Sequence, residues 1–224
     1  MPLIQLTPDE IDDLIYSVRV GDNQQLETDL AALSEKYQTK HSVITASAVD
    51  SAPESEGGSG CSLLHYPAAN GNEGILQFLI TNLMAARGSS TEETLTEQEI
   101  KNALNWKNHS GNTALHWAAL NMHLGCVKLL LDAGADVSIK NEAGHDAAFL
   151  AERADWKAGE ASQTQAEQGG EDEDEEMEVE VGTAEGDAAA ADAGPKTKAR
   201  EVVECILSYG EATPAAQGSA SEEL

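Results

Sequence analysis

Histidine and cysteine side chains are the residues of this sequence that could carry out chemistry, as general bases, nucleophiles or metal ligands. His65 and His116 lie in the similar strings S-L-L-H-Y and T-A-L-H-W. The cysteines Cys61, Cys126 and Cys205 form no C-x-x-C pair and have no histidine at metal spacing. No nucleophile has a base at a recognisable spacing, and the sequence contains no glycine-rich phosphate loop. We therefore expect no enzymatic activity, no cofactor, no metal and no disulfide framework.

The chain is strongly acidic. Its 224 residues include 40 Asp and Glu but 13 Lys and Arg, which gives a formal net charge of -27. Because phosphates would be repelled, we expect no nucleic acid or membrane partner and instead a basic protein client. The first ten residues lack the features of a signal peptide, and no run of about 18 apolar residues occurs. The sequence therefore predicts a soluble protein of a reducing compartment.

Much of this charge lies in one segment. Between Lys157 and Lys196 there are 13 acidic residues and no basic one. The run in the middle of this segment consists of Glu171, Asp172, Glu173, Asp174, Glu175 and Glu176. Large apolar side chains are too few to offset the entropy of ordering, so we predict a disordered acidic loop over 155–197. This run is either a solvated spacer or a shield that covers a basic ligand.

Two other stretches have a similar composition. Residues 42–60 are rich in Ser, Ala, Gly and Glu, and residues 211–224 resemble them. We predict a flexible loop over the first stretch and a disordered tail over the second.

An internal repeat of 33 residues organises the rest of the chain. The segment 108–140 contains T-x-L-H-x-A-A, then V-x-L-L-L, then G-A-D. A shift of 33 places Gly111 on Gly144 and Ala118 on Ala151. This pattern resembles the ankyrin repeat, a helix-turn-helix unit with a projecting β-turn.

The motif predicts how each unit is built. Thr113 can cap the first helix, apolar residues at i, i+3 and i+4 from Val127 face neighbouring repeats, and Gly134 ends the second helix in the left-handed region. In this motif the histidine hydrogen-bonds neighbouring turns. We therefore interpret His65 and His116 as structural residues.

Degenerate copies flank the regular one. We predict an all-α repeat solenoid of about four ankyrin repeats, with degenerate terminal repeats and the disordered acidic insertion. The predicted units are an N-terminal capping repeat (1–41), a repeat with an insertion (61–107), a regular repeat (108–140) and a C-terminal repeat (141–210) split by the acidic loop.

Local signals mark the ends of individual helices. Thr7 with Glu10, and Thr96 with Glu99, each have the spacing of a capping box, so a helix should follow each threonine. Pro67 occupies an inner position in the first helix of 61–107, where it removes a backbone donor. We expect that helix to begin late or to bend at the residue before the proline.

The second helix of the last repeat is predicted beyond the acidic loop. Val203, Ile206, Leu207 and Gly210 reproduce the spacing of the apolar residues and the final glycine of 108–140. A helix from Arg200 to Tyr209 should therefore close the stack.

A repeat stack binds partners through its concave face, which the turn tips and the first helices form. Threading the motif predicts that the partner-binding residues are Tyr66, Ala69, Asn70, His109, Ser110, Asn112, Trp117, Leu120, Asn121, Glu142, Ala143 and His145. His109 and His145 are expected to project into solvent. Exposed aromatic side chains dominate interfaces, which favours Trp117 with Tyr66 as the centre of the site. Trp117 could equally pack against the helix of a neighbouring repeat.

The strings G-N-T-A-L-H-W-A and G-H-D-A, together with an acidic stretch near the C-terminus, resemble the fungal yeast ankyrin repeat protein family. The resemblance implies a dedicated chaperone that holds the basic small-subunit ribosomal protein S-three soluble and shields its RNA-binding surface until ribosome assembly. It also implies a cytoplasmic and nuclear location, and we expect a monomer in the absence of the client. The alternatives are a generic ankyrin adaptor in signalling or transcription, and an acidic histone-binding protein.

Overall fold

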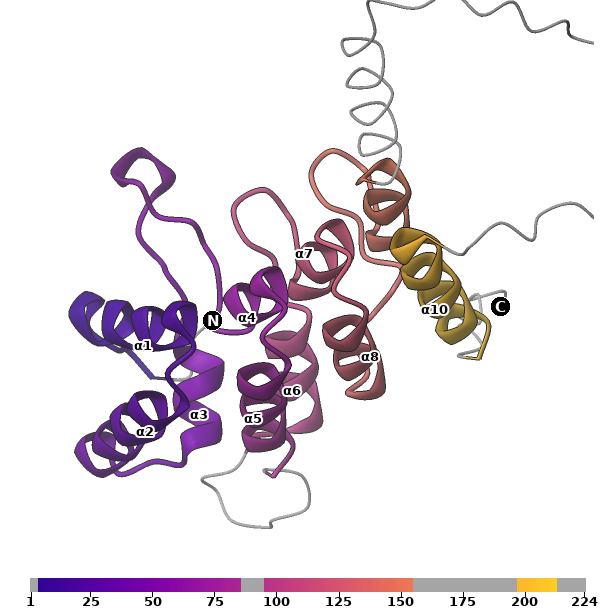
Figure 1. Cartoon of the computed structure of the whole chain (residues 1–224). Coiled ribbons are helices and arrows are strands. Elements are labelled where there is room, and N and C mark those ends of the chain that lie inside the picture. Colours follow the sequence, from indigo (N-terminus) through magenta and orange to yellow (C-terminus); the bar gives the residue numbers. More distant parts are fainter. Residues whose placement is uncertain (1–3, 86–94, 155–196, 213–224) are drawn as a thin grey trace, which may run out of the picture.

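The structure, a computed structural model, describes residues 4–85, 95–154 and 197–212 (Figure 1). Its helices are α1 (Pro8–Val20), α2 (Asn23–Tyr37), α3 (His41–Ser47), the 3-10 helix η1 (Glu54–Glu56), α4 (His65–Asn70), α5 (Glu73–Met84), α6 (Glu97–Leu104), α7 (Ala114–Leu120), α8 (Leu124–Asp132), a helix over 147–154, and α10 (Lys198–Ala212). Within these ranges, extended pairing is limited to one bridge between Val49 and Ser62.

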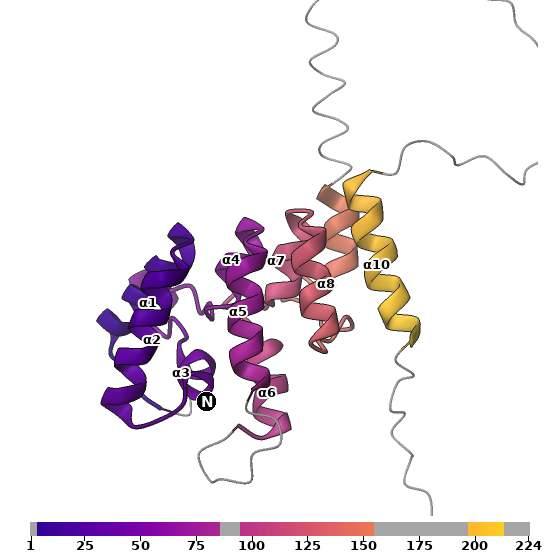
Figure 2. The ribbon, with the colours of Figure 1, turned by 60° about the horizontal axis from the view of Figure 1, so that its bottom comes forward.

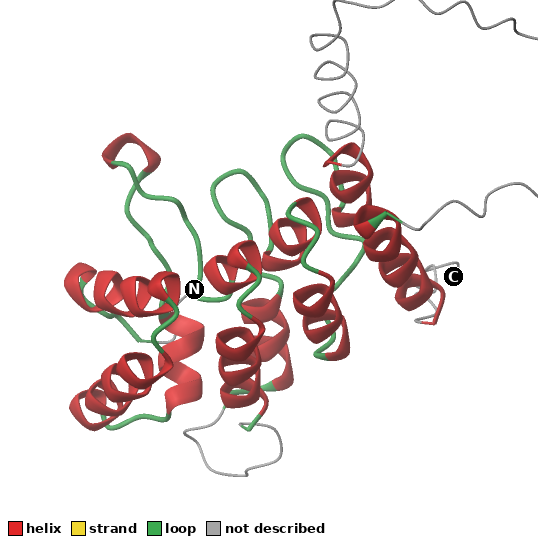
Figure 3. Ribbon diagram, viewed as in Figure 1, coloured by secondary structure: helices red, strands yellow, loops and turns green. Residues whose placement is uncertain are grey.

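The helices form two rows. The first helices of the repeats (α1, α4, α7 and 147–154) lie side by side, and the second helices (α2, α5, α8 and α10) form a parallel row (Figures 1 and 2). Long loops, which we call finger 1 (48–64), finger 2 (105–113) and finger 3 (133–146), project on the side of the first helices (Figure 3). One apolar core of Leu, Ile, Val and Ala runs between the rows. The predicted all-α ankyrin solenoid is confirmed.

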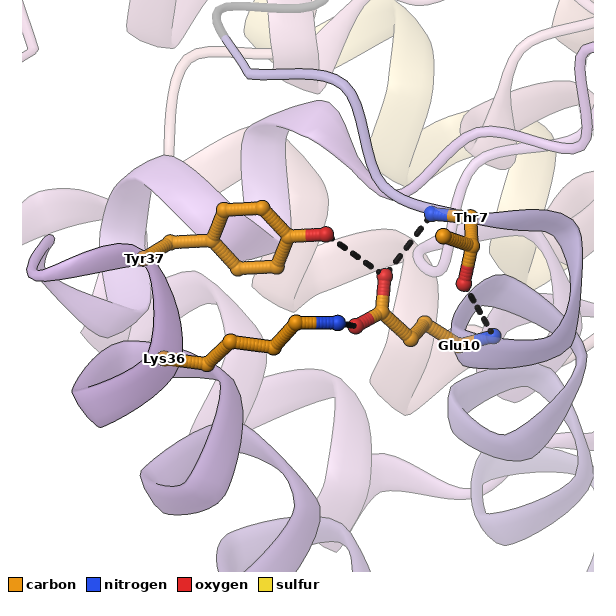
Figure 4. Close-up of polar contacts among 4 residues, drawn as sticks. All are labelled: Thr7, Glu10, Lys36 and Tyr37. Atoms are coloured by element: carbon orange, nitrogen blue, oxygen red, sulfur yellow. Dashed lines mark hydrogen bonds and ion pairs between the residues drawn. The ribbon is translucent and has the colours of Figure 1, made fainter.

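The N-terminal repeat begins as its capping signals predict. Thr7 is the N-cap of α1 and Pro8 its first residue, and the Glu10 side chain accepts a hydrogen bond from the Thr7 N–H at 2.7 Å. The same carboxylate binds the Lys36 ammonium at 2.5 Å and the Tyr37 hydroxyl at 2.8 Å (Figure 4). Although partial burial would raise the pKa of Glu10, the hydrogen bonds from Lys36, Thr7 and Tyr37 lower it to about 2. The cluster thus ties the start of α1 to the end of α2.

We expect Glu10→Gln to lower the free energy of unfolding by about 1–2 kcal/mol at pH 7, because the amide cannot form the ion pair with Lys36. Since the pKa of Glu10 is below its ordinary value of 4.5, its stabilisation is present above pH 4.5 and is lost as the pH falls toward 2. Urea unfolding at pH 7 and pH 3 checks this. An equal difference between the two proteins at both pH values would contradict it.

The prediction of a flexible loop over 42–60 is wrong for the first part of this stretch, which is helical. Residues 41–47 form α3, which packs against α2, α5 and α6, with Val43 and Ile44 buried. The segment that follows is finger 1, whose base is closed by the bridge between Val49 and Ser62. The small Ser and Ala side chains that suggested disorder let α3 approach its neighbours closely.

Two local predictions are confirmed: the capping box of the helix in the insertion, and the late start of the helix that contains Pro67. Thr96 and Glu99 form a capping box at α6, and Ile100 is buried beneath it. When His65 is aligned with His116, α4 begins two residues later in its repeat than α7 does. Pro67 therefore lies in the first turn of α4. Backbone N–H groups of a first turn have no partner within the helix, and the proline therefore costs no hydrogen bond.

The helix predicted at the C-terminal end is present as α10, which packs against α8 and α7. Val202 and Ile206 are buried. Leu207 is 55% exposed, because no further repeat of the described chain packs against α10. The prediction that Gly210 ends this helix is wrong, since α10 continues to Ala212. The predicted acidic loop, including Glu171 to Glu176, and nearly all of the predicted tail lie outside the described residues.

Candidate ligand-binding face

Two buried histidines connect successive repeats. The Nδ1 atom of His65 accepts a hydrogen bond from the Ser62 N–H at 3.1 Å, and its Nε2 lies 3.0 Å from the carbonyl oxygen of Asn112 in finger 2. His116 repeats the pattern one unit later: its Nδ1 accepts from the N–H of the helix cap Thr113 at 3.2 Å, and its Nε2 lies 3.2 Å from the His145 carbonyl. Each imidazole is therefore neutral, with its proton on Nε2. The structural interpretation of both residues is confirmed.

Acid should weaken the hydrogen bonds that His65 and His116 form between repeats, which we call the histidine ladder. Burial lowers the pKa of His65 to about 4, and it also lowers the pKa of His116. The unfolded chain binds a proton near pH 6.5 that the folded ring binds only near pH 4, so stability is complete above pH 6.5 and falls as the pH drops toward 4. His65 alone should cost about 3 kcal/mol at pH 4. Urea unfolding at pH 7, 5.5 and 4.5 checks this, and a constant free energy of unfolding would contradict it.

The thiols show no sign of activation. All three cysteines are free, burial raises the pKa of Cys126 to about 11, and it also raises the pKa of Cys61 and Cys205. Reactive cysteines have a lowered pKa instead. Among the described residues no group of His, Cys, Asp and Glu could hold a metal ion. None of the described helices combines the length and the apolar character needed to cross a membrane.

The exposed apolar side chains gather on the first helices. Five large apolar residues of the described ranges are well exposed, and four of them belong to this row: Tyr16 (68% exposed), Val20 (61%), Leu120 (43%) and Phe149 (42%). The half-buried Tyr66 and Trp117 belong to the same row. We call these six residues the inner apolar face. Exposed apolar groups collected on one row of helices are typical of a surface that binds another protein.

Tyr66 and Trp117 hold related positions in α4 and α7. The Trp117 ring meets the His65 ring edge-on, with the ring centroids 5.9 Å apart. The Arg19 guanidinium lies over the Tyr66 ring, 5.9 Å from its centroid. Both rings remain half-buried. Trp117 thus contacts the neighbouring repeat, as one alternative held, and keeps part of its surface accessible to a partner.

The other predicted residues of this region lie at the C-terminal ends of α4 and α7. Asn70, Leu120 and Asn121 are exposed, and Ala69 is half-buried. The Asn121 amide donates a hydrogen bond to the Ala69 carbonyl at 2.8 Å, which joins the ends of the two helices. The structure therefore brings Ala69 and Asn121, which belong to adjacent repeats, into contact.

The predicted finger residues differ in their exposure. Ser110, Glu142 and Ala143 are exposed at the tips, whereas Asn112 is half-buried and accepts a bond from Asn141. The expectation that His109 and His145 project into solvent is wrong. Nδ1 of His109 lies 3.1 Å from the Gly58 carbonyl of finger 1, and the His145 ring stacks on Phe149 with the centroids 4.2 Å apart. The contact of His109 with Gly58 joins finger 2 to finger 1.

Sequence reasoning missed three residues of the inner apolar face, Tyr16, Val20 and Phe149. The signal for Tyr16 was available, because the 50-residue shift that places Gly21 on Gly71 also places Tyr16 on Tyr66.

The N-terminal part of the scaffold carries most of its net charge. Residues 9–56 contain 11 acidic and three basic residues, whereas residues 95–154 contain seven acidic and five basic ones. The part of the scaffold that carries Tyr16 and Val20 is therefore its most acidic part.

Known proteins share this architecture. A family model described as ankyrin repeats, in three copies, matches residues 30–141. A chain in the solved structure of the yeast ribosomal protein Rps3 in complex with its chaperone Yar1 is 30% identical, with a TM-score of 0.52, and the match covers 76% of this chain and 100% of that chain.

Two curated proteins match a shorter region. Synphilin-1 of Mus musculus is 35% identical over 92 residues, which is 41% of this chain and 8% of that protein. The probable E3 ubiquitin-protein ligase XBOS32 of Oryza sativa subsp. japonica is 36% identical over 90 residues, 35% of this chain and 18% of that protein. The chain thus spans less than a fifth of the length of these two relatives.

Proposed function

Because this chain belongs to the ankyrin repeat family, whose stacked repeats bind other proteins, we propose that it is a dedicated chaperone of a basic ribosomal protein of the Rps3 type. The observation that carries the proposal is the 30% identity to a chain of the Rps3–Yar1 complex. The match covers the full length of that chain. A resemblance limited to the regular repeat would indicate the family alone. This one includes the degenerate parts of the stack as well.

The surface of the molecule supports such a client. A ribosomal protein that has not met its RNA exposes Lys and Arg side chains, which bind stray nucleic acid unless they are covered. The inner apolar face offers aromatic side chains for packing, and residues 9–56, which include Tyr16 and Val20 of that face, contain 11 acidic and three basic residues. We propose that the face holds the client and that carboxylates shield the adjacent RNA-binding surface. Cytoplasm and nucleus are the proposed locations, since ribosomal proteins are made in one and assembled in the other.

The test is to mix the purified chain with an Rps3-type ribosomal protein and to measure how much of the client stays in solution. We expect an equimolar amount of the chain to keep the client soluble, and bovine serum albumin, which is also acidic, to fail as the control. A client that precipitates equally in both samples would contradict the proposal. The same result for any basic protein in place of the client would indicate a nonspecific charge effect.

Association should depend on salt. Because opposite charges steer the encounter, we expect the association rate constant to fall about tenfold or more between 0.05 and 0.5 M NaCl. The dissociation rate constant should change less, since packing on the inner apolar face holds the complex. Stopped-flow fluorescence checks both values. An association rate that does not change with salt would contradict the shielding role.

A further inference from the structure

Tyr66 of the inner apolar face is joined to an anionic network at the base of finger 1. The Asp50 Oδ2 atom accepts a hydrogen bond from the Ser59 N–H at 2.6 Å and lies 2.7 Å from the Ser59 Oγ. The Ser59 Oγ lies in turn 3.3 Å from the Tyr66 hydroxyl oxygen. Although burial would raise the pKa of Asp50, the bonds from Ser59 and Ala52 lower it, so that its side chain is a carboxylate at neutral pH.

Counting hydrogens fixes the direction of each bond. A carboxylate can only accept, so the single hydrogen of the Ser59 hydroxyl points to Asp50. The Ser59 Oγ also accepts the Cys61 N–H at 3.2 Å. In the contact between Ser59 and Tyr66, the hydrogen must therefore come from the tyrosine. This leaves the Tyr66 oxygen with lone pairs and no hydrogen to offer a partner.

The surroundings of Tyr66 leave its hydroxyl as the place where a cation can bind. The Arg19 guanidinium already covers a ring face, 5.9 Å from the ring centroid, and would repel a second cation there. No described residue other than Ser59 is hydrogen-bonded to the Tyr66 hydroxyl. The negative charge of Asp50 lies behind Ser59, so the relay favours a positively charged donor over a neutral one.

We infer that Tyr66 determines specificity by accepting a hydrogen bond from a lysine ammonium or an arginine guanidinium of the client. These groups are donors without an acceptor, which matches an oxygen that can only accept. A carboxylate at the same place would meet lone pairs and the charge of Asp50, and is rejected. The inference rests on the proposed function and gives one contact of the basic client a chemical identity.

A double-mutant cycle with an Rps3-type client tests it. Tyr66→Phe removes the hydroxyl and keeps the ring, and we expect it to weaken binding about tenfold, as measured by isothermal titration calorimetry. Substituting the lysines and arginines of the client one at a time by methionine should find one whose effect disappears in the Tyr66→Phe background. The matched control is Tyr209→Phe on α10, which removes a hydroxyl outside the inner apolar face and should leave affinity unchanged.

Ser59→Ala provides a second arm. Without Ser59 the Tyr66 hydroxyl is free to point its hydrogen outward, so we expect weaker binding and a smaller effect of adding Tyr66→Phe. Wild-type protein that does not bind the client would refute the proposed function and this inference together. Binding in which no Lys or Arg of the client couples to Tyr66, or in which an Asp or Glu does, would overturn the inference alone.

Discussion

Replacing Trp117 and Tyr66 by alanine in one chain is expected to weaken binding of an Rps3-type client about 100-fold or more. Both rings are half-buried on the inner apolar face, at equivalent positions of α4 and α7. Aromatic residues at the centre of an interface commonly contribute about 2 kcal/mol or more each when they are truncated, and each such loss corresponds to about 30-fold in affinity. The effect should appear mainly in the dissociation rate, because packing rather than charge is removed.

The control for this experiment is Leu207→Ala. Leu207 is also a large exposed apolar residue, 55% exposed, but it lies on α10 in the row of second helices. Its substitution should change client affinity less than twofold. Circular dichroism and thermal unfolding of the double variant verify that the stack still folds. Unchanged affinity in a folded double variant would show that the client binds elsewhere.

His65→Ala is expected to lower the free energy of unfolding by about 3–5 kcal/mol. The substitution leaves a cavity at a fully buried site. It also removes the acceptor of the Ser62 N–H and the donor to the Asn112 carbonyl, so two inter-turn bonds are lost. A loss of this size is a large fraction of the stability of a small domain, so the variant should unfold at markedly lower urea concentration.

Two observations would test the reason for that loss as well as its size. His41→Ala, at the start of α3 and only half-buried, is the matched control and should cost less than about 1 kcal/mol. In His65→Ala, much of the loss of stability between pH 7 and pH 4.5 should disappear, because the buried imidazole is its main source. A variant as pH-dependent as the wild type would contradict the histidine ladder.

The repeat register and the helix ends could be predicted because local chemistry sets them. Thr7 with Glu10 and Thr96 with Glu99 form their capping boxes within four consecutive residues. Gly134, which follows α8, has the positive φ of 96° that its place in the motif required. The helix beyond the acidic segment could be placed because its apolar spacing copies that of α8.

Features that depend on long-range packing were missed. Helix α3 has only seven residues, and Val43 and Ile44 hold it in place by packing against α2 and α5, which the local sequence does not reveal. The pattern of a single repeat places His109 and His145 at solvent-exposed tips. Finger 1 and Phe149, which only the folded chain brings beside them, cover part of both side chains.

The candidate site could be predicted only where the repeat motif is retained. Tyr66 and Trp117 follow directly from the motif, which α4 and α7 retain. Tyr16 was overlooked because the N-terminal repeat has lost the T-x-L-H string that identifies the position. The hydrogen-bond relay from Asp50 through Ser59 to Tyr66 depends on the fold of finger 1 and has no sequence signature.

The most direct test of the account is to isolate the tagged chain from its native cells at low salt and to identify the proteins that accompany it by mass spectrometry. The account predicts that a small-subunit ribosomal protein of the Rps3 type is the main partner, in near-equal amount. It also predicts that the partner is lost from the Trp117→Ala, Tyr66→Ala double variant. Recovery of a kinase, a transcription factor or a histone as the main partner, without that ribosomal protein, would contradict it.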